Sequence, residues 1–224
     1  MRSKAQFVIS CHADTGFRSH RCRLEKGGTV CFGHLDNFAG VKAVMDAYFS
    51  GGLDREGVRI ELTYGEETDF GGAKAVRRTL SKEDTVVVVD VTGAKTRADI
   101  TIEKCADPET GRFVRKALAG MRKVAIFSGC PDPVSDSDET DVYRGRARRV
   151  FFLGIPCSGG DYNTGRVRCR KKSLTAAARA LTRLARAHHC DARVGNPGPR
   201  KRPGASEIRT GRNRRTPRTA ARHR

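Results

Sequence analysis

Short apolar runs that end in acidic or histidine residues constrain the fold of this chain more than any other feature. Such short, β-branched runs predict buried strands. In open α/β sheets, ligands bind beyond the carboxyl ends of the strands, and imidazole and carboxylate groups gathered there suit Zn²⁺ or a similar ion. The sequence therefore predicts a metal site at one sheet edge, from motifs at His12-Ala13-Asp14, Asp36-Asn37, Glu66-Glu67 and Asp90.

Strand-like and helix-like segments alternate along the chain, which predicts a three-layer αβα sandwich. Strands are expected at 5–11, 58–64, 85–91, 99–104 (an edge strand), 124–127 and 150–155, the last of them stopped by Pro156. Helices are expected at 37–49, 72–80 and 113–121, and in a long segment capped by Ser173. The helix at 37–49 is expected to bury a stripe of Phe38, Val41, Met45 and Tyr48, and the last helix a stripe of Leu174, Ala177, Ala178, Leu181 and Leu184.

Positive charge is concentrated at the end of the chain. Residues 193–224 hold eleven Lys or Arg and one acidic residue, a net +10 out of the chain's +19. Their Pro, Gly and Arg-rich composition lacks hydrophobic periodicity, so we expect a disordered tail after one folded domain at 1–192. The tail could make weak, non-specific phosphate contacts with nucleic acid, although it has no aromatic residues for base stacking.

Other features exclude several classes of protein. No run approaches the roughly 20 apolar residues of a membrane span, and residues 1–4 lead into a strand without a signal-peptide pattern. We therefore expect a cytoplasmic protein without membrane contact. The eight cysteines contain no Cys-x-x-Cys pair, which argues against a zinc ribbon or redox motif and favours buried thiols. No Gly-x-Ser-x-Gly elbow supports a serine hydrolase.

The four motifs, taken in order, resemble the co-catalytic zinc exopeptidase superfamily of aminopeptidases, carboxypeptidases and related deacylases. The resemblance extends over residues 5–188 and includes Gly40 after Asp36-Asn37, Gly65 before Glu66-Glu67, and Gly154-Ile155-Pro156 in the last strand. It implies a mixed, mostly parallel sheet. It also implies a metal-dependent hydrolase that cleaves an amide bond, of exopeptidase type, acting on a peptide or an N-acyl amino-acid-like substrate.

The resemblance assigns a role to each matched residue. His12 and Asp90 would bind one zinc ion and Glu67 a second, with Asp36 bridging the two. Asp14 would orient His12, as a carboxylate often does for a ligating imidazole. Glu66 would be the general base that takes a proton from metal-activated water.

One departure from the family concerns the second metal. Asn163 occupies the position of the histidine that closes the family's second metal site after the Gly-Ile-Pro strand. A carboxamide oxygen is a weaker zinc ligand than imidazole, so the second ion would be loose, absent or held partly by Asp161. A catalytically decayed relative with one metal or none is therefore the alternative, and a nucleic-acid-associated protein is the second alternative.

Three further features leave alternatives open. His34-Leu35-Asp36 repeats the spacing of His12-Ala13-Asp14, and His34 is either a structural histidine or a substrate contact. The acidic run at 136–141 either faces the amine of a peptide or begins a solvated helix. Only about fifty residues separate Asp90 from this run, which leaves no room for the inserted lid domain of larger family members.

Overall fold

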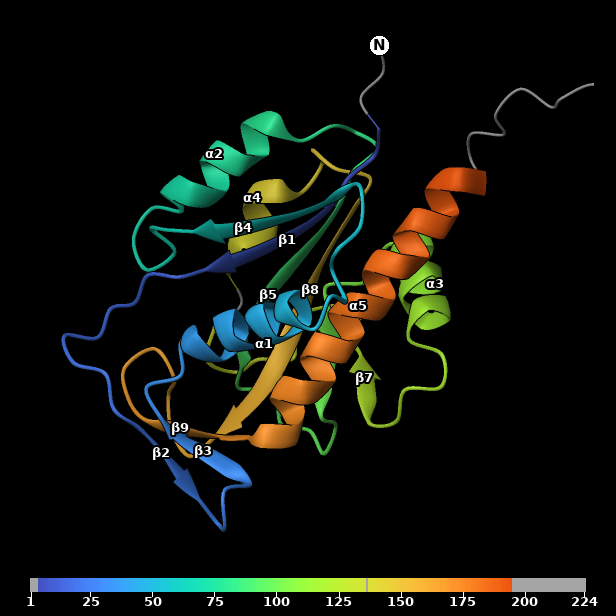
Figure 1. The fold of residues 1–224 in the computed structure, drawn as a ribbon. Helices are drawn as coiled ribbons and strands as arrows, with labels where there is room; N and C mark the ends of the chain where they lie inside the picture. Colours follow the sequence, from blue (N-terminus) through green and yellow to red (C-terminus); the bar gives the residue numbers. More distant parts are fainter. Residues whose placement is uncertain (1–3, 136, 195–224) are drawn as a thin grey trace, which may run out of the picture.

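The computed structural model describes residues 4–135 and 137–194. Their strands form one mixed sheet, ordered β2-β3-β9-β8-β5-β1-β4, with β6 paired to β8 and β7 paired to β6 (Figure 1). The strands are β1 Phe7–His12, β2 Cys22–Glu25, β3 Val30–Gly33, β4 Val58–Thr63, β5 Thr85–Thr92, β6 Ile100–Glu103, β7 Val124–Ile126, β8 Arg149–Ser158 and β9 Val167–Arg170. The helices are α1 Phe38–Phe49, α2 Gly71–Thr79, α3 Pro108–Ala117, α4 Glu139–Tyr143 and α5 Lys171–Val194.

The centre of the sheet is parallel. β4, β1, β5 and β8 run in the same direction, so their carboxyl ends meet at one edge. Every residue of β1 and β5 is buried, because helices cover both faces of these strands. This explains why their sequences are continuous apolar runs and why the polar residues that follow them share one edge.

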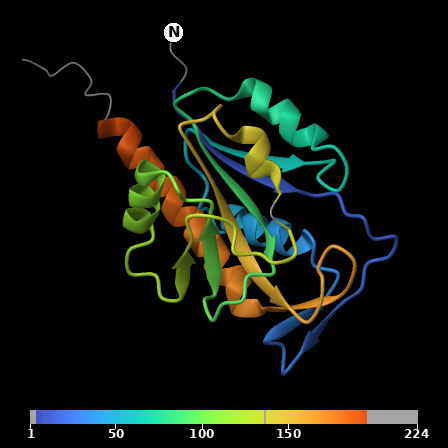
Figure 2. The ribbon, with the colours of Figure 1, turned by 180° about the vertical axis from the view of Figure 1, so that it is seen from behind.

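Helices pack on both faces, as a three-layer sandwich requires (Figures 1 and 2). One core joins α1, α3 and α5 to the face of β1 that carries Phe7, Ile9 and Cys11. A smaller core joins α2 and α4 to the opposite face, which carries Val8. Because side chains alternate along a strand, His12 points to the side of α2 and α4. The predicted three-layer fold with a mixed sheet is confirmed.

The apolar stripe predicted for α1 is correct only in part, because Val41 and Met45 pack against the larger core and are partly buried, but the other two residues are exposed. The helix buries Ala39, Gly40, Ala43, Val44 and Ala47, whereas Phe38 and Tyr48 are 41% and 52% exposed. The buried face packs against α5, and small side chains there allow the two helices to lie close together. The stripe predicted for α5 is buried as expected, but the helix begins at Lys171, and Ser173 lies inside it rather than capping it.

Three element boundaries also differ from prediction. β6 is not an edge strand, because it lies between β7 and β8 and is fully buried. β8 continues past Pro156. Proline has no N–H group to donate, but the pairing of β8 with β6 has already ended at Gly154, so no carbonyl of β6 loses a partner there. α3 starts at Pro108 because Asp107 caps it. The short strands β2, β3 and β9 were not predicted, and α4 was expected only as one alternative, a helix start in the acidic run at 136–141.

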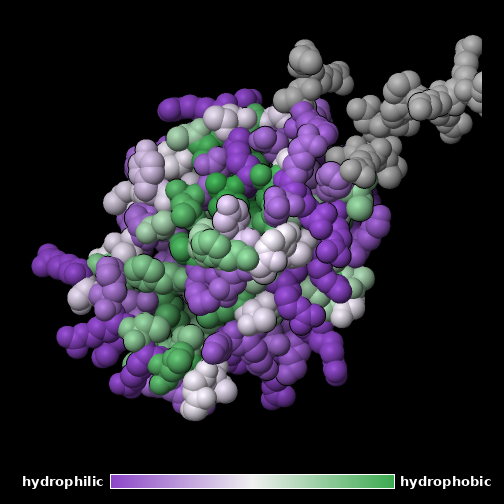
Figure 3. Space-filling view, viewed as in Figure 1, coloured by the Kyte–Doolittle hydropathy of each residue, from purple (hydrophilic) through white to green (hydrophobic). Residues whose placement is uncertain are grey.

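The surface is largely hydrophilic, with apolar residues gathered over α1 and the β2–β3 hairpin (Figure 3). The exposed apolar side chains there are Leu24, Phe38 and Phe49. No helix within the described ranges is long and apolar enough to cross a membrane. All eight cysteines are free thiols, and four of them are buried. Of the expected tail, residues 195–224 lie outside the described residues.

Candidate metal centre

The centre of the site is His12, the last residue of β1, whose side chain is 2% exposed. Its Nε2 atom lies 3.2 Å from Oδ1 of Asp36 and 3.1 Å from Oδ2 of Asp90. An imidazole nitrogen carries at most one proton, so Nε2 cannot donate to both carboxylates. One nitrogen and two oxygens facing each other in this way is an arrangement suited to a shared cation.

The sheet register brings two of these residues together. Ser10 of β1 pairs with Val88 of β5, so two residues further on His12 and Asp90 lie level at the carboxyl edge. Both strands present alternate side chains to the same face, which turns His12 and Asp90 to the side of α2 and α4.

Asp36 is placed by the residue that follows it. Asn37 caps α1 by accepting a hydrogen bond from the Gly40 backbone at 2.9 Å. The Asn37 Nδ2 donates to the Val89 carbonyl at 2.8 Å and to the Cys11 thiol at 3.4 Å. Asn37 thus ties the start of α1 to β1 and β5, next to the two strands that carry His12 and Asp90.

The Glu66-Glu67 turn after β4 forms the other side of the site. Ligand atoms of His12, Glu66 and Glu67 lie within 4.8 Å of one another, as do those of His12, Asp36 and Asp90. Asp14 connects the two sides, because its Oδ2 accepts from the Gly65 backbone at 2.9 Å and its Oδ1 lies 3.6 Å from Nδ1 of His12. The first four predicted motifs are therefore adjacent in space.

Burial and like charge perturb these groups strongly. Burial raises the pKa of Glu66 to about 7; His12 opposes this shift, whereas Asp36 and Glu67 add to it. Burial lowers the pKa of His12, but the carboxylates of Asp90 and Asp36 outweigh it and raise the value to about 12. Burial also raises the pKa of Asp90. Five carboxyl groups around one imidazole leave excess negative charge in a largely buried place, and a divalent cation would offset it. The residues present therefore fit a metal ion.

Asn163 lies on the loop between β8 and β9. It lines a recess beside the cluster, here called the acidic recess, together with Asp36, Glu66, Asp90, Glu103, Asp132, Asp138 and Tyr162. Asp161 does not line this recess, and its two oxygens accept from the Asn163 backbone at 2.9 Å and the Thr164 hydroxyl at 3.1 Å. The structure therefore brings Asn163, and not Asp161, into one recess with Asp36 and Asp90. The role of Asn163 as a metal ligand stays a prediction.

Sequence reasoning missed three members of the acidic recess. The Tyr162 hydroxyl donates to Asp132 at 2.6 Å, and the Gly93 backbone donates to the same oxygen at 2.7 Å. Burial raises the pKa of Glu103 to about 7, although the hydrogen bonds from Thr101 and Thr92 lower it. Asp132 stands between two prolines, and that rigid loop is the one signal that could have drawn attention to it.

Two of the alternatives left open by the sequence concern residues of this region. His34 stacks on Phe17 with ring centroids 4.2 Å apart and belongs to neither ligand group, which favours the structural role. Asp138 caps α4 by accepting from Thr140 at 2.7 Å, which confirms the helix start. The helix start is not solvated, however, because Glu139 is 1% exposed and accepts from Ser10 at 2.7 Å. Asp136 lies outside the described residues.

Comparison with known proteins identifies the fold. No protein-family model matches the sequence, and no curated protein is significantly similar to it. Solved structures with the same fold include the dodecamer of PhTET1-12s (TM-score 0.60, 16% identity) and a TET aminopeptidase from a marine-sediment archaeon of the Thaumarchaeota (TM-score 0.61, 13% identity). An M18-family aminopeptidase from Thermotoga maritima is also similar (TM-score 0.57, 17% identity).

These alignments cover 74%, 76% and 75% of this chain but 53%, 55% and 48% of the respective structures. The chain therefore spans about half the length of these proteins. It has the fold of the aminopeptidase structures to which the four motifs pointed, and identities this low show the fold alone.

Proposed function

We propose that this chain is a metal-dependent hydrolase that cleaves an amide or peptide bond, of exopeptidase type. The observation that carries this proposal is the approach of Asp36 and Asp90 to one buried nitrogen of His12, with Glu66 beside them. Zinc bound there would supply Lewis acidity, activating water and polarising the scissile carbonyl. His12, Asp36 and Asp90 would hold one ion, and Glu67 with Asn163 would hold the second more weakly.

Glu66 is the proposed general base. It lies within reach of His12 and lines the acidic recess, but it is not part of the His12–Asp36–Asp90 group. A carboxylate in a half-buried place can take a proton from the attacking water and pass it to the leaving amine. Asp14 acts through His12, because its two oxygens face Nδ1 of His12 and the Gly65 backbone. It therefore orients both the imidazole and the turn that carries Glu66.

The acidic recess favours the amino end of a peptide as the part that is bound next to the ligand cluster. Asp132, Asp138 and Glu103 line it beside Asp36 and Asp90, and no lysine or arginine among the described residues does. Of these carboxylates, Asp138 pairs with the ammonium group of Lys104 at 3.0 Å, outside the recess. A concave surface lined by one sign of charge concentrates ligands of the opposite sign. A protonated α-amine is such a ligand, which supports an aminopeptidase over a carboxypeptidase.

A catalytically decayed relative is the second candidate, and Asn163 is the observation that favours it. If the second position binds no ion, the chain would hold one metal and lack measurable turnover. Metal content measured by plasma mass spectrometry, together with hydrolysis of aminoacyl and peptide substrates, separates the two candidates. Two ions with turnover support the hydrolase, and one or none without turnover supports decay.

Glu66→Gln tests the mechanism. We expect bound metal to be unchanged and kcat to fall by about 10²–10⁴-fold, the contribution of a positioned general base. The matched control is Glu83→Gln, which makes the same change at an exposed glutamate after α2 and should leave kcat unaltered. Ordinary turnover by Glu66→Gln would show that another group moves the proton.

A further inference from the structure

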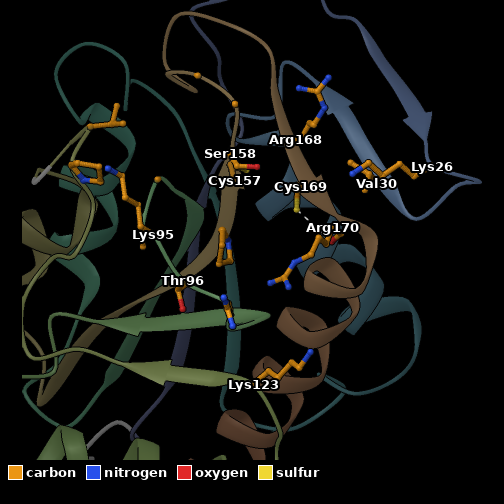
Figure 4. Close-up of a pocket in the computed structure, with 18 residues that line it drawn as sticks. Lys26, Val30, Lys95, Thr96, Lys123, Cys157, Ser158, Arg168, Cys169 and Arg170 are labelled. Carbon is orange, nitrogen blue, oxygen red and sulfur yellow. Dashed lines mark hydrogen bonds between the residues drawn. The ribbon is translucent and has the colours of Figure 1, made fainter.

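A second hollow, here called the basic cavity, lies at the carboxyl ends of β5 and β8 and has a volume of about 800 Å³ (Figure 4). Its walls come from the loop after β5, the end of β8, β9 and the β2–β3 turn. No carboxylate from the described part of the chain lines it. The cationic residues that do are Lys26, Lys95, Arg97, Lys123, Arg168 and Arg170.

Most of this positive charge is not neutralised. Arg168 pairs with Glu25 at 3.0 Å, and Arg170 pairs with Asp99 at 3.2 Å. Within residues 4–135 and 137–194, the remaining four cations of the basic cavity form no ion pair. Figure 4 shows the labelled cations on four segments of the chain, with Lys26 in the β2–β3 turn, Lys95 after β5, Lys123 before β7, and both Arg168 and Arg170 on β9. Such a surface attracts anions.

The basic cavity is close to the proposed metal centre. Gly93 lines the basic cavity and follows Asp90 by three residues, one residue after the end of β5. At the rise per residue of a β-strand, Gly93 lies about 10 Å from Asp90 along the strand direction. The wall between the basic cavity and the acidic recess is the loop at 132–134, whose Asp132 accepts from Gly93 at 2.7 Å. An extended peptide advances about 3.3–3.6 Å per residue. A group two or three residues beyond a bond at the metal centre would therefore reach the basic cavity.

The two hollows carry opposite charge along one edge of the sheet. Among the residues that the structure describes, carboxylates but no lysine or arginine line the acidic recess, and lysines and arginines but no carboxylate line the basic cavity. A short peptide has the same polarity, with an ammonium group at one end and a carboxylate at the other. Electrostatic complementarity of this kind selects partners and their orientation.

We propose that the basic cavity binds the carboxylate of a short peptide whose amide bond lies at the His12–Asp36–Asp90 cluster. The chain thereby selects peptides that carry negative charge two or three residues beyond the cleaved bond. This inference rests on the proposed hydrolase function. It adds a substrate class and assigns Lys95, Arg97 and Lys123 to substrate binding.

The test compares a tripeptide that ends in a free carboxylate with the same tripeptide ending in an amide. We expect kcat/KM to be about tenfold higher for the free acid, mostly through KM, because a charge-assisted contact is made in the bound state. The ratio should shrink as salt rises, since ions screen exposed charges over about 8 Å at physiological ionic strength. Equal kcat/KM values for the two peptides would overturn the inference and leave the proposed hydrolase standing.

Variants locate the effect. Lys95→Ala combined with Lys123→Ala should bring the acid-to-amide ratio close to one. Arg77→Ala combined with Arg78→Ala removes the same charge from the exposed end of α2 and should keep the ratio. A ratio that survives in the first pair, or falls equally in both pairs, contradicts the assignment.

Binding separates this inference from the hydrolase proposal. If neither peptide is cleaved in the presence of zinc, manganese or cobalt, the hydrolase proposal has failed, and titration calorimetry with the same two peptides still tests the basic cavity. Tighter binding of the acid, lost in the Lys95/Lys123 pair, supports it. Equal binding overturns it. A single-stranded oligonucleotide that displaces the tripeptide with a steep salt dependence would also overturn it, in favour of a nucleic-acid site.

Discussion

Replacing Gly40 by alanine in α1 should destabilise the protein, although alanine is the better helix former. A Cβ at this position would lie 2.2 Å from Oδ1 of Asn37 and 2.8 Å from its Cγ and Nδ2 atoms. Asn37 cannot easily move, because its side chain is buried and bonded to Gly40, Val89 and Cys11. The substitution must therefore displace Asn37.

The size of the effect follows from the bonds that would be lost. Loss of the helix cap costs about 1 kcal/mol. Leaving the Val89 carbonyl buried without its donor costs about 1–3 kcal/mol. The gain in helix propensity offsets about 1 kcal/mol of this. We expect Gly40→Ala to lower the free energy of unfolding by about 1–3 kcal/mol, which is about 2–4 °C in Tm per kcal/mol for a domain of this size.

Urea unfolding followed by circular dichroism measures this change, and α3 supplies a matched control. Gly111 also lies in the first half of its helix, but a Cβ there meets only the end of the flexible Arg115 side chain, at 2.9 Å. Gly111→Ala should therefore be neutral or stabilising. The reasoning is refuted if Gly40→Ala is as stable as Gly111→Ala. Because Asn37 adjoins Asp36, the Gly40 variant should also bind metal more weakly in calorimetry.

Two further predictions concern the second metal and the pH dependence of stability. Asn163→His should raise the affinity for a second zinc ion, since imidazole is the stronger ligand; unchanged stoichiometry and affinity by calorimetry would count against Asn163 as a ligand position. Burial lowers the pKa of His188, so the unfolded chain takes up a proton below about pH 6.5 that the folded chain resists. Stability should therefore fall with decreasing pH below that value, more steeply than in His188→Gln. If the free energy of unfolding of the two proteins falls equally with decreasing pH, His188 is not the cause.

The sequence predicted the positions of the central strands along the chain, because the signals that mark a strand are local. Continuous apolar runs marked β1, β5 and β8, and an alternating run marked β4, which lies at the edge of the sheet and is only partly buried. Polar residues marked where three of these strands end. Asn37 and Gly40 marked the start of α1. The short elements β2, β3 and β9 escaped because no apolar periodicity defines strands of four residues, and α4 was foreseen only as a helix start in the acidic run.

The α1 stripe shows where local patterns fail. Phe38, Val41, Met45 and Tyr48 have helical spacing, but the helix turns its alanines inward to pack against α5. Which face of an amphipathic helix is buried depends on the shape of its partner, and that partner begins more than a hundred residues later. Similarly, Asp132, Tyr162 and Glu103 occupy unremarkable sequence positions and become neighbours only through the loops beyond β5 and β8.

By itself, the sequence determined that imidazole and carboxylate groups follow several predicted strands. Because the carboxyl ends of parallel strands lie at one edge of a sheet, these groups had to meet there. Tertiary structure alone decided that Asp36 and Asp90 share one nitrogen of His12, that Asn163 borders the same recess, and that lysines and arginines from separate loops surround a neighbouring cavity. These relations depend on register and on loop paths, which join residues far apart in the chain and leave no periodic trace along it.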